Sequence, residues 1–482
     1  MNNIKNTNNY LVGTFSTSQQ VIFGRKKTNG IIYKVYTYNN DQQYYLISYN
    51  GKLKGKLIII FKPINDKEGT IIDIIGLMNE DNLIKTLQYI YNIFKKNQRL
   101  ISIINSLENN INRILINKNI LSIDPYNCND IDDAISYEKN EYYYIIGIYI
   151  AQPIYYLSLE IIEEYSKKTF STLYNEPYAK NNNLWGDEIT SNSSLYPNIL
   201  RPVYAIFYYY NINLELEKVD HFPAKIINKI QTNYEECLQF CNDLYILTNK
   251  LELINDTHEM VSYWMIKSNN YIGNIFSNLN LPKRVIKKSL IEIIDIDDDN
   301  DIKNIFLNKL SNSAYYSLDD NYHEILDKFD YIHMTSPIRR IMDTINHWCI
   351  TYNINYNDLN INIDDINRLD KLTKKYHNNI KLLSLIEKLE NEQELYGWIY
   401  KNNWNKNIKQ NKSIKLTVYF KEIGFQRVEL WNYKFINIIN KNDINKIQNL
   451  QIGNKYLFKI YKIAGFLPCH KIKIILSENN II

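Results

Sequence analysis

Short β-type runs occupy both ends of the chain, and this pattern limits what the chain can fold into. Between residues 10 and 78 the runs are separated by Asn, Asp, Gly and Lys turns, and they read "YLVGTF", "GIIYKVYTY", "YYLISY", "KLIIIF" and "GTIIDIIG". Residues 397–477 repeat the style with "GWIY", "IKLTVYF", "RVELW", "YLFKIYKI" and "KIKIIL". Such spacing predicts a small β domain at each end, and an OB barrel is one of the forms that fit.

The segments next to these ends have helical periodicity. They are "EDNLIKTLQYIYNIFKKNQ", residues 80–98, and "NNIKLLSLIEKLENEQELYGW", residues 378–398, and we interpret both as helical connectors. A chain of 482 residues has room for about three domains. The pattern therefore predicts a central body between two β modules.

Charge is distributed unevenly along the chain. Residues 1–100 carry 14 Lys and Arg against 6 Asp and Glu, and residues 401–482 carry 15 against 4. The whole chain has a net charge of +4, so residues 101–400 have a net charge of −15. Basic ends around an acidic centre favour polyanion-binding modules beside a catalytic core, although solvated lysines on unremarkable domains are the alternative.

The sequence also predicts the compartment. Its five cysteines are scattered and form no CxxC pair, which argues against a disulfide framework or a zinc knuckle. Neither a secretion signal nor a membrane span is expected, because the most apolar window, residues 142–162, contains Gln152, Pro153 and Glu160. We expect an intracellular, cytoplasmic protein; the excess of Ile, Asn, Lys and Tyr indicates an AT-rich coding sequence, and a viral source is one option.

An acidic run precedes a mostly apolar stretch in the first half of the chain. "SIDPYNCNDIDDAIS", residues 122–136, contains Asp124, Asp130, Asp132 and Asp133, and the apolar residues 142–151 follow. Crowded carboxylates beside a buried strand need a cation, and oxygen ligands without Cys or His suit magnesium or manganese. A solvated acidic loop is the alternative, since residues 294–302 and 361–370 are also acidic.

A second segment offers an anion site. "YIHMTSPIRRIMDTINHW", residues 331–348, predicts a helix with Ser336 as N-cap, Pro337 at its first position, and Arg339 and Arg340 in its first turn. A helix N-terminus with arginines binds phosphate through backbone N–H groups and guanidinium groups. An ordinary capped surface helix is the alternative.

The two segments together resemble the ribonuclease II family, whose catalytic domain is called RNB. The family pattern Asp-x5-Asp-x-Asp-Asp-Ala is matched at 124–134, and Tyr-x-His-x-Thr-Ser-Pro-Ile-Arg-Arg at 331–340. Weaker similarity is found in "TLYNEPY", "SSLYPNILRP" and "IINKIQTNYEEC". The resemblance implies an α+β multidomain protein with a mixed α/β RNB domain flanked by all-β OB-fold barrels. The implied domains are a cold-shock-type OB domain at 1–80, a helical linker at 81–111, the RNB domain at 112–395 and a C-terminal RNA-binding OB domain at 396–482.

The same resemblance implies a function. Family members are magnesium-dependent exoribonucleases that degrade single-stranded RNA processively from the 3' end to nucleoside 5'-monophosphates, and manganese is a possible substitute metal. We expect a monomer with no membrane association. The implied site roles are as follows: Asp124, Asp130, Asp132 and Asp133 as metal ligands; Asp132, Asp133 and Arg339 as catalytic residues; Arg339 on the scissile phosphate; and Tyr174, Tyr234, Arg339 and Arg340 as RNA-binding residues.

Three departures from the family pattern leave a second hypothesis open. Tyr149 and Gln152 stand where relatives have His and Asp, and residues 182–188 erode a family Met-Leu-Pro stretch. A family glutamate is missing at Ser262, and Glu259, about one helical turn earlier, is a candidate substitute. The second hypothesis is therefore a degenerate relative that binds RNA without cleaving it, and a DNA-directed nuclease is a third.

Overall fold

The structure is a computed structural model that describes residues 10–18, 23–24, 30–37, 40–91, 100–101, 103–286, 314–388, 392–403, 415–420, 425–431, 455–462 and 472–476. The chain divides into two compact units. The first unit comprises residues 1–94, 175–180 and 375–482, and the second comprises residues 95–174 and 181–374. All the residues of the predicted site belong to the second unit.

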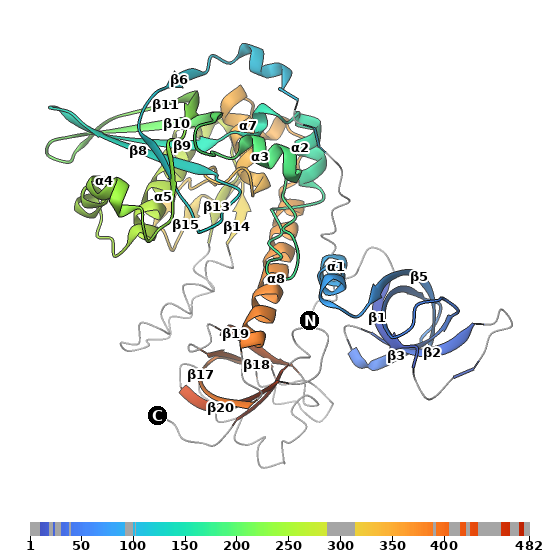
Figure 1. Cartoon of the computed structure of the whole chain (residues 1–482). Helices are drawn as coiled ribbons and strands as arrows, with labels where there is room; N and C mark the ends of the chain where they lie inside the picture. Colours follow the sequence, from blue (N-terminus) through green and yellow to red (C-terminus); the bar gives the residue numbers. More distant parts are fainter. Residues whose placement is uncertain are drawn as a thin grey trace. The chain divides into compact units, whose positions relative to one another are not determined.

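The N-terminal strands close into a barrel (Figure 1). Its strands are β1 (Leu11–Ser16), β2 (Ile31–Thr37), β3 (Asn40–Tyr49), β4 (Lys56–Pro63) and β5 (Glu68–Leu77), in the order β1-β2-β3-β5-β4 with β1 also paired to β4. This is the connectivity of an OB-like barrel. At Gly13 a Cβ atom would lie 2.5 Å from Val35 Cγ1, so the interior accepts only glycine there. The five expected N-terminal strands are confirmed.

The C-terminal strands form a second sheet with related connectivity. They are β17 (Glu392–Asn403), β18 (Lys415–Phe420), β19 (Phe425–Trp431), β20 (Lys455–Lys462) and β21 (Ile472–Leu476), in the order β19-β18-β17-β20-β21. This is the cyclic order of the N-terminal barrel, opened between its third and fifth strands, as in a partly open OB fold. The five expected C-terminal strands are confirmed.

The two helical connectors are confirmed only in part. Helix α1 (Glu80–Ile90) begins at the Asn79 cap, whose side chain accepts the Asn82 N–H at 3.0 Å. Helix α8 (Ile363–Lys388) occupies only the first half of the second segment. The expectation of helix at 392–398 is wrong, because these residues are the start of β17 and pair with β18 and β20. Cross-strand pairing therefore overrides the local helical pattern.

A seven-stranded sheet forms the centre of the second unit (Figure 1), in the order β12-β7-β8-β9-β10-β11-β6. Its strands are β6 (Ile114–Ile116), β7 (Ile120–Ile123), β8 (Asp133–Lys139), β9 (Tyr143–Ala151), β10 (Leu200–Asn211), β11 (Leu216–Ile227) and β12 (Ile230–Thr232). The central pairs are antiparallel, and the two edge pairs, β12 with β7 and β11 with β6, are parallel. The apolar run of residues 142–151 is β9, in the middle of the sheet.

Side chains of β9 point alternately into two cores. Ile146, Ile148 and Ile150 join the larger core, and Tyr149 and Ala151 join the smaller one. Among the described residues, six helices contribute to the larger core: α2 (Leu159–Ser166), α3 (Gly186–Ser193), α4 (Leu238–Leu251), α5 (Thr257–Ile275), α7 (Ile341–Tyr352) and the first turns of α8. A mixed α/β unit whose sequence is flanked by OB-like β modules is the α+β multidomain class that the sequence predicts.

Two further expectations concern the described part of the chain. No helix there is long and apolar enough to cross a membrane. The four cysteines described, Cys128, Cys237, Cys241 and Cys349, are all free, and Cys469 lies outside the described residues. Among the acidic runs used for comparison, residues 294–302 lie outside the described residues, whereas residues 361–370 lead into and begin α8. The bounds of the four predicted domains stay predictions.

Candidate active site

The acidic loop connects the end of β7 to the start of β8. Asp124 directly follows β7, and its N–H donates to the Thr232 carbonyl of β12 at 3.0 Å. The Ile131 side chain is fully buried in the smaller core, and its N–H donates to Ser194 Oγ at 2.8 Å. The Asp132 carbonyl accepts the Ala151 N–H of β9 at 2.8 Å. The loop is thus fixed at both ends by neighbouring strands.

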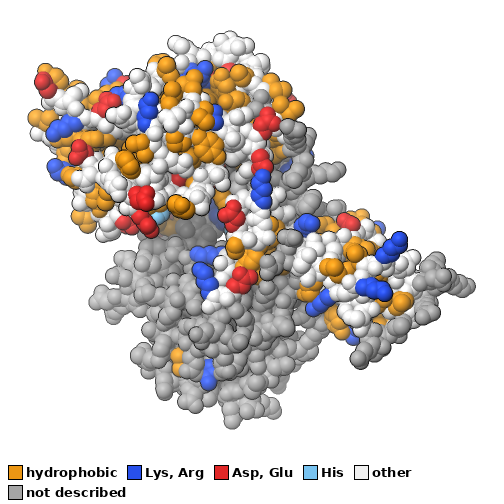
Figure 2. Space-filling view, viewed as in Figure 1, with side chains coloured by type: hydrophobic (Ala, Val, Ile, Leu, Met, Phe, Trp, Pro, Cys, Tyr) orange, Lys and Arg blue, Asp and Glu red, His pale blue; other side chains and the backbone are white. Residues whose placement is uncertain are grey.

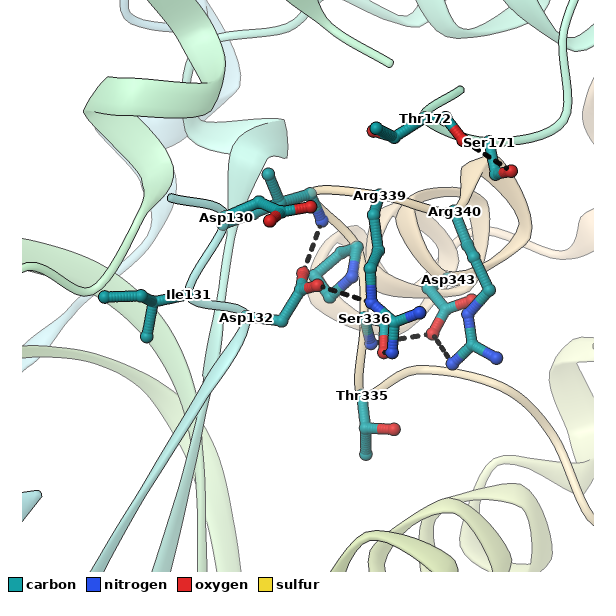
Figure 3. A network of polar contacts seen from close by, with 12 residues as sticks. Asp130, Ile131, Asp132, Ser171, Thr172, Thr335, Ser336, Arg339, Arg340 and Asp343 are labelled. Atoms are coloured by element: carbon teal, nitrogen blue, oxygen red, sulfur yellow. Dashed lines mark hydrogen bonds and ion pairs between the residues drawn. The ribbon is translucent and has the colours of Figure 1, made fainter. Parts of the chain in front are cut away.

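Asp132 faces the arginine motif across the site (Figure 3). Its Oδ1 accepts the Ile338 N–H at 2.7 Å, and its Oδ2 accepts from Arg339 Nε at 3.2 Å. Asp132 is 3% exposed, while the Arg339 side chain is 44% exposed. Burial raises the pKa of Asp132 well above its usual range, although Arg339 opposes the shift. Asp132 therefore holds Arg339 in place while the Arg339 side chain stays partly open to solvent.

The other three aspartates of the loop repel one another. Asp124 Oδ2 is buried without a hydrogen-bond partner among the described residues. Burial, together with Asp133 and Asp130, raises the pKa of Asp124 to about 8. Burial also raises the pKa of Asp133 to about 6, against the effect of Arg339. Carboxylates this crowded favour either protonation or a cation nearby.

Both predicted tyrosines lie beside this loop. The Tyr174 hydroxyl donates to Asp130 Oδ2 at 2.6 Å, and the residue is 37% exposed. Tyr234 follows β12, and burial together with the nearby Asp133 and Asp124 raises its pKa to about 12. The Tyr234 ring stacks on His258, with the ring centroids 3.5 Å apart. The structure therefore brings both tyrosines to the acidic loop.

The arginine motif does not begin a helix, so the predicted helix start is wrong. Residues 337–340 form a turn in which the Ser336 carbonyl accepts the N–H of Arg340 at 2.9 Å. Arg340 is extended and forms an antiparallel bridge with Ser171, and α7 begins only at Ile341. The bridge to the 170–172 segment draws the backbone out of the helical conformation, so Ser336 is not the N-cap.

Arg339 and Arg340 point to different partners. Arg339 Nη2 donates to Ser336 Oγ at 2.9 Å, beside Asp132. Arg340 Nη2 donates to Asp343 Oδ1 at 2.9 Å, and its Nη1 donates to His333 Nδ1 at 3.3 Å. Arg339 thus faces the acidic loop, whereas Arg340, predicted to bind RNA, makes contacts within the protein (Figure 3).

Sequence reasoning missed several residues that support the motif. Asp343 Oδ1 also accepts the Ser336 N–H at 2.8 Å. Asn269 on α5 accepts the Met334 N–H at 2.9 Å and donates to Thr335 Oγ1 at 3.3 Å. Trp185 Nε1 donates to the Pro337 carbonyl at 3.1 Å. Trp185 lies inside the 182–188 stretch already singled out, and Asn269 lies on the same helix as Ser262, so position in or near a family motif was the available signal.

Two of the three departures have structural roles. Gln152 is fully buried, and its Nε2 donates to His347 Nδ1 at 3.1 Å, while His347 Nε2 donates to the Met334 carbonyl at 2.7 Å. Trp185, in the eroded 182–188 stretch, supports Pro337 through its indole N–H. Glu259 is not at the loop; its Oε2 accepts the Asn255 N–H at 2.6 Å in a capping arrangement at the start of α5. The expectation that Glu259 substitutes for the family glutamate is not supported by this placement.

The fit to a metal ion is partial. Within the described part of the chain, no group of three or more His, Cys, Asp or Glu side chains is arranged to hold a metal ion. The donor chemistry nevertheless suits a hard cation, because Asp124 has a buried oxygen without a partner and Asp130 and Asp133 add negative charge nearby. Magnesium commonly uses one or two carboxylates and completes its shell with water and substrate phosphate.

Comparison with known proteins identifies the family. The model of the RNB domain family matches residues 112–260 and 245–356, which together span just over half of the chain. The chain belongs to the RNB domain family. The RNB match contains the acidic loop, Tyr174, Tyr234 and both arginines. Comparison with curated protein sequences gives no match.

Solved structures share the fold of this RNB protein. RNase R of Mycoplasma genitalium in its apo form is 17% identical, with 98% of this chain and 90% of that chain covered and a TM-score of 0.74. The complex of that RNase R with ribose-methylated single-stranded RNA is 16% identical, with 98% of this chain and 90% of that chain covered and a TM-score of 0.73. Yeast Ssd1, a pseudonuclease, is 11% identical, with 95% of this chain and 68% of that chain covered and a TM-score of 0.59. The RNB fold is therefore shared by RNase R and by a pseudonuclease.

Proposed function

We propose that this RNB protein is a hydrolytic exoribonuclease that degrades single-stranded RNA from the 3' end to nucleoside 5'-monophosphates, with magnesium or manganese as cofactor. The observation that carries the proposal is the buried, unpartnered Asp124 oxygen in a loop that Arg339 also faces. The unpartnered Asp124 oxygen can bind a metal ion, and the Arg339 guanidinium is a cationic partner for a phosphate. Together they suit the hydrolysis of a phosphodiester with a metal ion.

Each residue of the loop has a part in this proposal. Asp124, Asp130 and Asp133 would hold the metal, and Asp132 orients Arg339 toward the scissile phosphate. When bound, the metal would supply charge compensation and an activated water for phosphodiester hydrolysis. The guanidinium of Arg339, on a side chain that is partly exposed, can hold a phosphate oxygen while negative charge develops there. Tyr174 and Tyr234 offer rings beside the same phosphate.

The likeness to RNase R supports RNA as the substrate. That protein has been solved with single-stranded RNA, and this chain shares its fold over 98% of its own length. The N-terminal barrel supports the same substrate, since basic residues outnumber acidic ones on its visible face in Figure 2. A basic barrel in the same chain as an acidic site suits a polyanion that must be brought to a metal.

The test uses a 5'-labelled, unstructured RNA and the DNA of the same sequence, each with magnesium, with manganese and with chelator. We expect a ladder that shortens from the 3' end with RNA and metal only. Monophosphates should be the released products. Intact RNA in all metal-containing reactions would contradict the proposal. Shortening of the DNA at the same rate as the RNA would indicate a DNA-directed nuclease instead.

A specific observation favours one alternative, an RNB protein that binds RNA without cleaving it. Among the described residues no three-carboxylate metal group is assembled, and Ssd1 shows that the fold also occurs in a pseudonuclease. In that case a gel-shift assay with the same RNA should give a bound complex while the RNA stays intact. Binding and cleavage measured together therefore separate the two functions.

A further inference from the structure

A histidine outside the predicted site extends the ring of Tyr234. The His258 and Tyr234 rings lie face to face, with centroids 3.5 Å apart and planes 13° apart. His258 is the second residue of α5 and is exposed. Because Tyr234 covers one face of the imidazole, the exposure of His258 comes from its other face and its edge.

Hydrogen bonds between side chains and backbone groups fix the stacking contact of Tyr234 and His258. Thr257 Oγ1 donates to the Tyr234 carbonyl at 2.6 Å, which ties the start of α5 to the segment after β12. The Asp256 side chain accepts the Glu259 N–H at 2.8 Å, and Glu259 in turn accepts the Asn255 N–H. This reciprocal capping fixes the first turn of α5, and with it the position of the imidazole.

The ring pair starts at the acidic loop. The carbonyl of Thr232, two residues before Tyr234, accepts the Asp124 N–H at 3.0 Å, so Tyr234 follows a residue that is bonded to the acidic loop. The stack therefore runs from the loop at Tyr234 to solvent at His258.

We propose that His258 and Tyr234 form a two-ring platform on which the base of the 3'-terminal nucleotide stacks, so that His258 is a substrate-positioning residue. This inference rests on the proposed function, because it takes the acidic loop as the place of the scissile phosphate. Imidazole and phenol rings stack on any base, which suits an enzyme that must accept every nucleotide in turn.

His258 lies near the position on α5 where the family glutamate is missing. Ser262 stands where the family pattern has that glutamate, and His258 precedes it by four residues, one turn away on the same helical face. Glu259 caps the helix instead. His258, by contrast, stacks its ring on Tyr234.

The test is fluorescence of 2-aminopurine in a short single-stranded RNA bound to the full chain, with calcium in place of magnesium, so that a cation offsets the charge of the acidic loop while cleavage is suppressed. The fluorophore is placed at the 3' end in one RNA and at an internal position in another. We expect the wild-type protein to quench the 3'-terminal fluorophore on binding. His258→Ala should lose most of that quenching and bind a trinucleotide about fivefold more weakly or worse.

Two further variants keep the inference falsifiable. His258→Phe retains a ring and should retain the quenching, whereas a role in folding alone would not separate Phe from Ala. Tyr142→Ala, which removes a ring that is 70% exposed at the β8–β9 turn, should leave the quenching unchanged. Terminal quenching that is equal in wild type and His258→Ala overturns the platform while the proposed function stands. Failure of the wild-type chain to bind either RNA overturns both.

Discussion

Asp132 has partners within the protein for both carboxylate oxygens, whereas Asp124 leaves one buried oxygen without a partner among the described residues. The four aspartates of the loop therefore divide into two kinds. Asp132 orients Arg339 and accepts the Ile338 N–H, and the other three provide negative charge for a cation. The sequence pattern treats the four aspartates alike, whereas in the structure Asp132 has different partners from the other three.

The first prediction is that Asp132→Asn abolishes cleavage but leaves the protein folded. The amide loses its charge and turns either its oxygen or its nitrogen to the Arg339 donor, so the guanidinium is no longer fixed. Loss of one well-placed electrostatic group costs about 3 to 4 kcal/mol in a transition state, or about 10²- to 10³-fold in rate. Removing a buried charge whose pKa is already raised offsets the lost ion pair, so thermal unfolding should change little.

The matched control for this variant is Asp364→Asn, in the acidic run at the start of α8. Asp364 is exposed and belongs to another Asp-Asp pair. Cleavage rates measured side by side should be normal for Asp364→Asn. Equal cleavage rates in the two variants would mean that residues 122–136 are only a solvated acidic loop.

The second prediction concerns metal binding and pH. The raised pKa of Asp124, about 8, lies above its unfolded value near ~4, so in chelator the free energy of unfolding falls as pH rises from about 4 to 8. Magnesium should reverse this fall, because it replaces the proton. A metal concentration of 100 Kd adds about 2.7 kcal/mol.

Thermal unfolding with magnesium and with chelator checks this at pH 6 and pH 8. The difference in Tm should be larger at pH 8, and Asp124→Asn should remove most of it. A magnesium effect that is the same in Asp124→Asn would place the metal elsewhere.

At the scale of elements, the start of α7 is joined to the arginine turn through one carboxylate. Asp343 is fully buried and accepts from both Ser336 and Arg340. His333 Nδ1 accepts from Arg340 and, at 2.7 Å, from Tyr316. Burial, followed by the charge of Arg340, lowers the pKa of His333 well below its usual range, so the imidazole is neutral. Arg340 thus acts on the site through Asp343.

The third prediction compares two Arg–Asp pairs of the same helical spacing. Asp343→Ala leaves Arg340 and the Ser336 N–H without their acceptor in a buried place, so it should destabilise the protein by about 3 to 5 kcal/mol. Asp365→Ala breaks the half-exposed pair with Arg368 and should change stability by about 1 kcal/mol or less. Urea unfolding measures both. Similar losses in the two variants would mean that Asp343 does not hold the turn.

The fourth prediction concerns β2 and β3 of the N-terminal barrel. Tyr36 and Tyr44 are 39% and 37% exposed, and Lys34 Nζ lies 3.8 Å from the centre of the Tyr44 ring. This combination suits stacked bases with a phosphate nearby. Replacing both tyrosines with Ala should weaken binding of single-stranded RNA by about fivefold or more, from ~1 to 3 kcal/mol per stacked base.

Fluorescence anisotropy of a labelled RNA measures that change. Ile72→Ala on β5, where the side chain is 51% exposed, is the control and should bind normally. Unchanged affinity in the double tyrosine variant would remove this face of the barrel from the RNA path.

At the scale of the whole molecule, charge separates the modules from the catalytic unit. Residues 401–482 carry a net charge of +11, and residues 101–400 carry −15. The acidic centre repels phosphate unless metal is bound, so the basic ends must supply most of the attraction for RNA. Under the proposed function, binding and cleavage should therefore be separable by mutation.

The fifth prediction is that deletion of residues 397–482 weakens RNA binding and flattens its dependence on salt. For a single strand, the slope of log K against log salt becomes shallower by about 0.7 for every phosphate that the protein no longer neutralises. Metal-dependent cleavage of short substrates should persist. Affinity and slope measured from 50 to 200 mM salt check this, and unchanged values would exclude the C-terminal module from RNA binding.

The sequence by itself determined the strands of both β modules, the α+β class and the two segments that form the site. Strand patterns, turns and the acidic loop depend on residues that are close together in the chain, so they can be predicted from local periodicity and turn chemistry. The misread segments were those where a distant strand decides the backbone. Residues 392–398 became β17 through pairing, and Arg340 became extended through its bridge to Ser171.

Only the tertiary structure decided what each side chain of the site contacts. Asp132 meets Arg339, which lies 207 residues away in the chain, and Gln152 meets His347 at a separation of 195. Glu259 and His258 are neighbours in sequence, yet the first caps α5 and the second stacks on Tyr234. Burial and long-range hydrogen bonds assign these partners, because a side chain's direction depends on how sheet and helices pack, which no local pattern encodes.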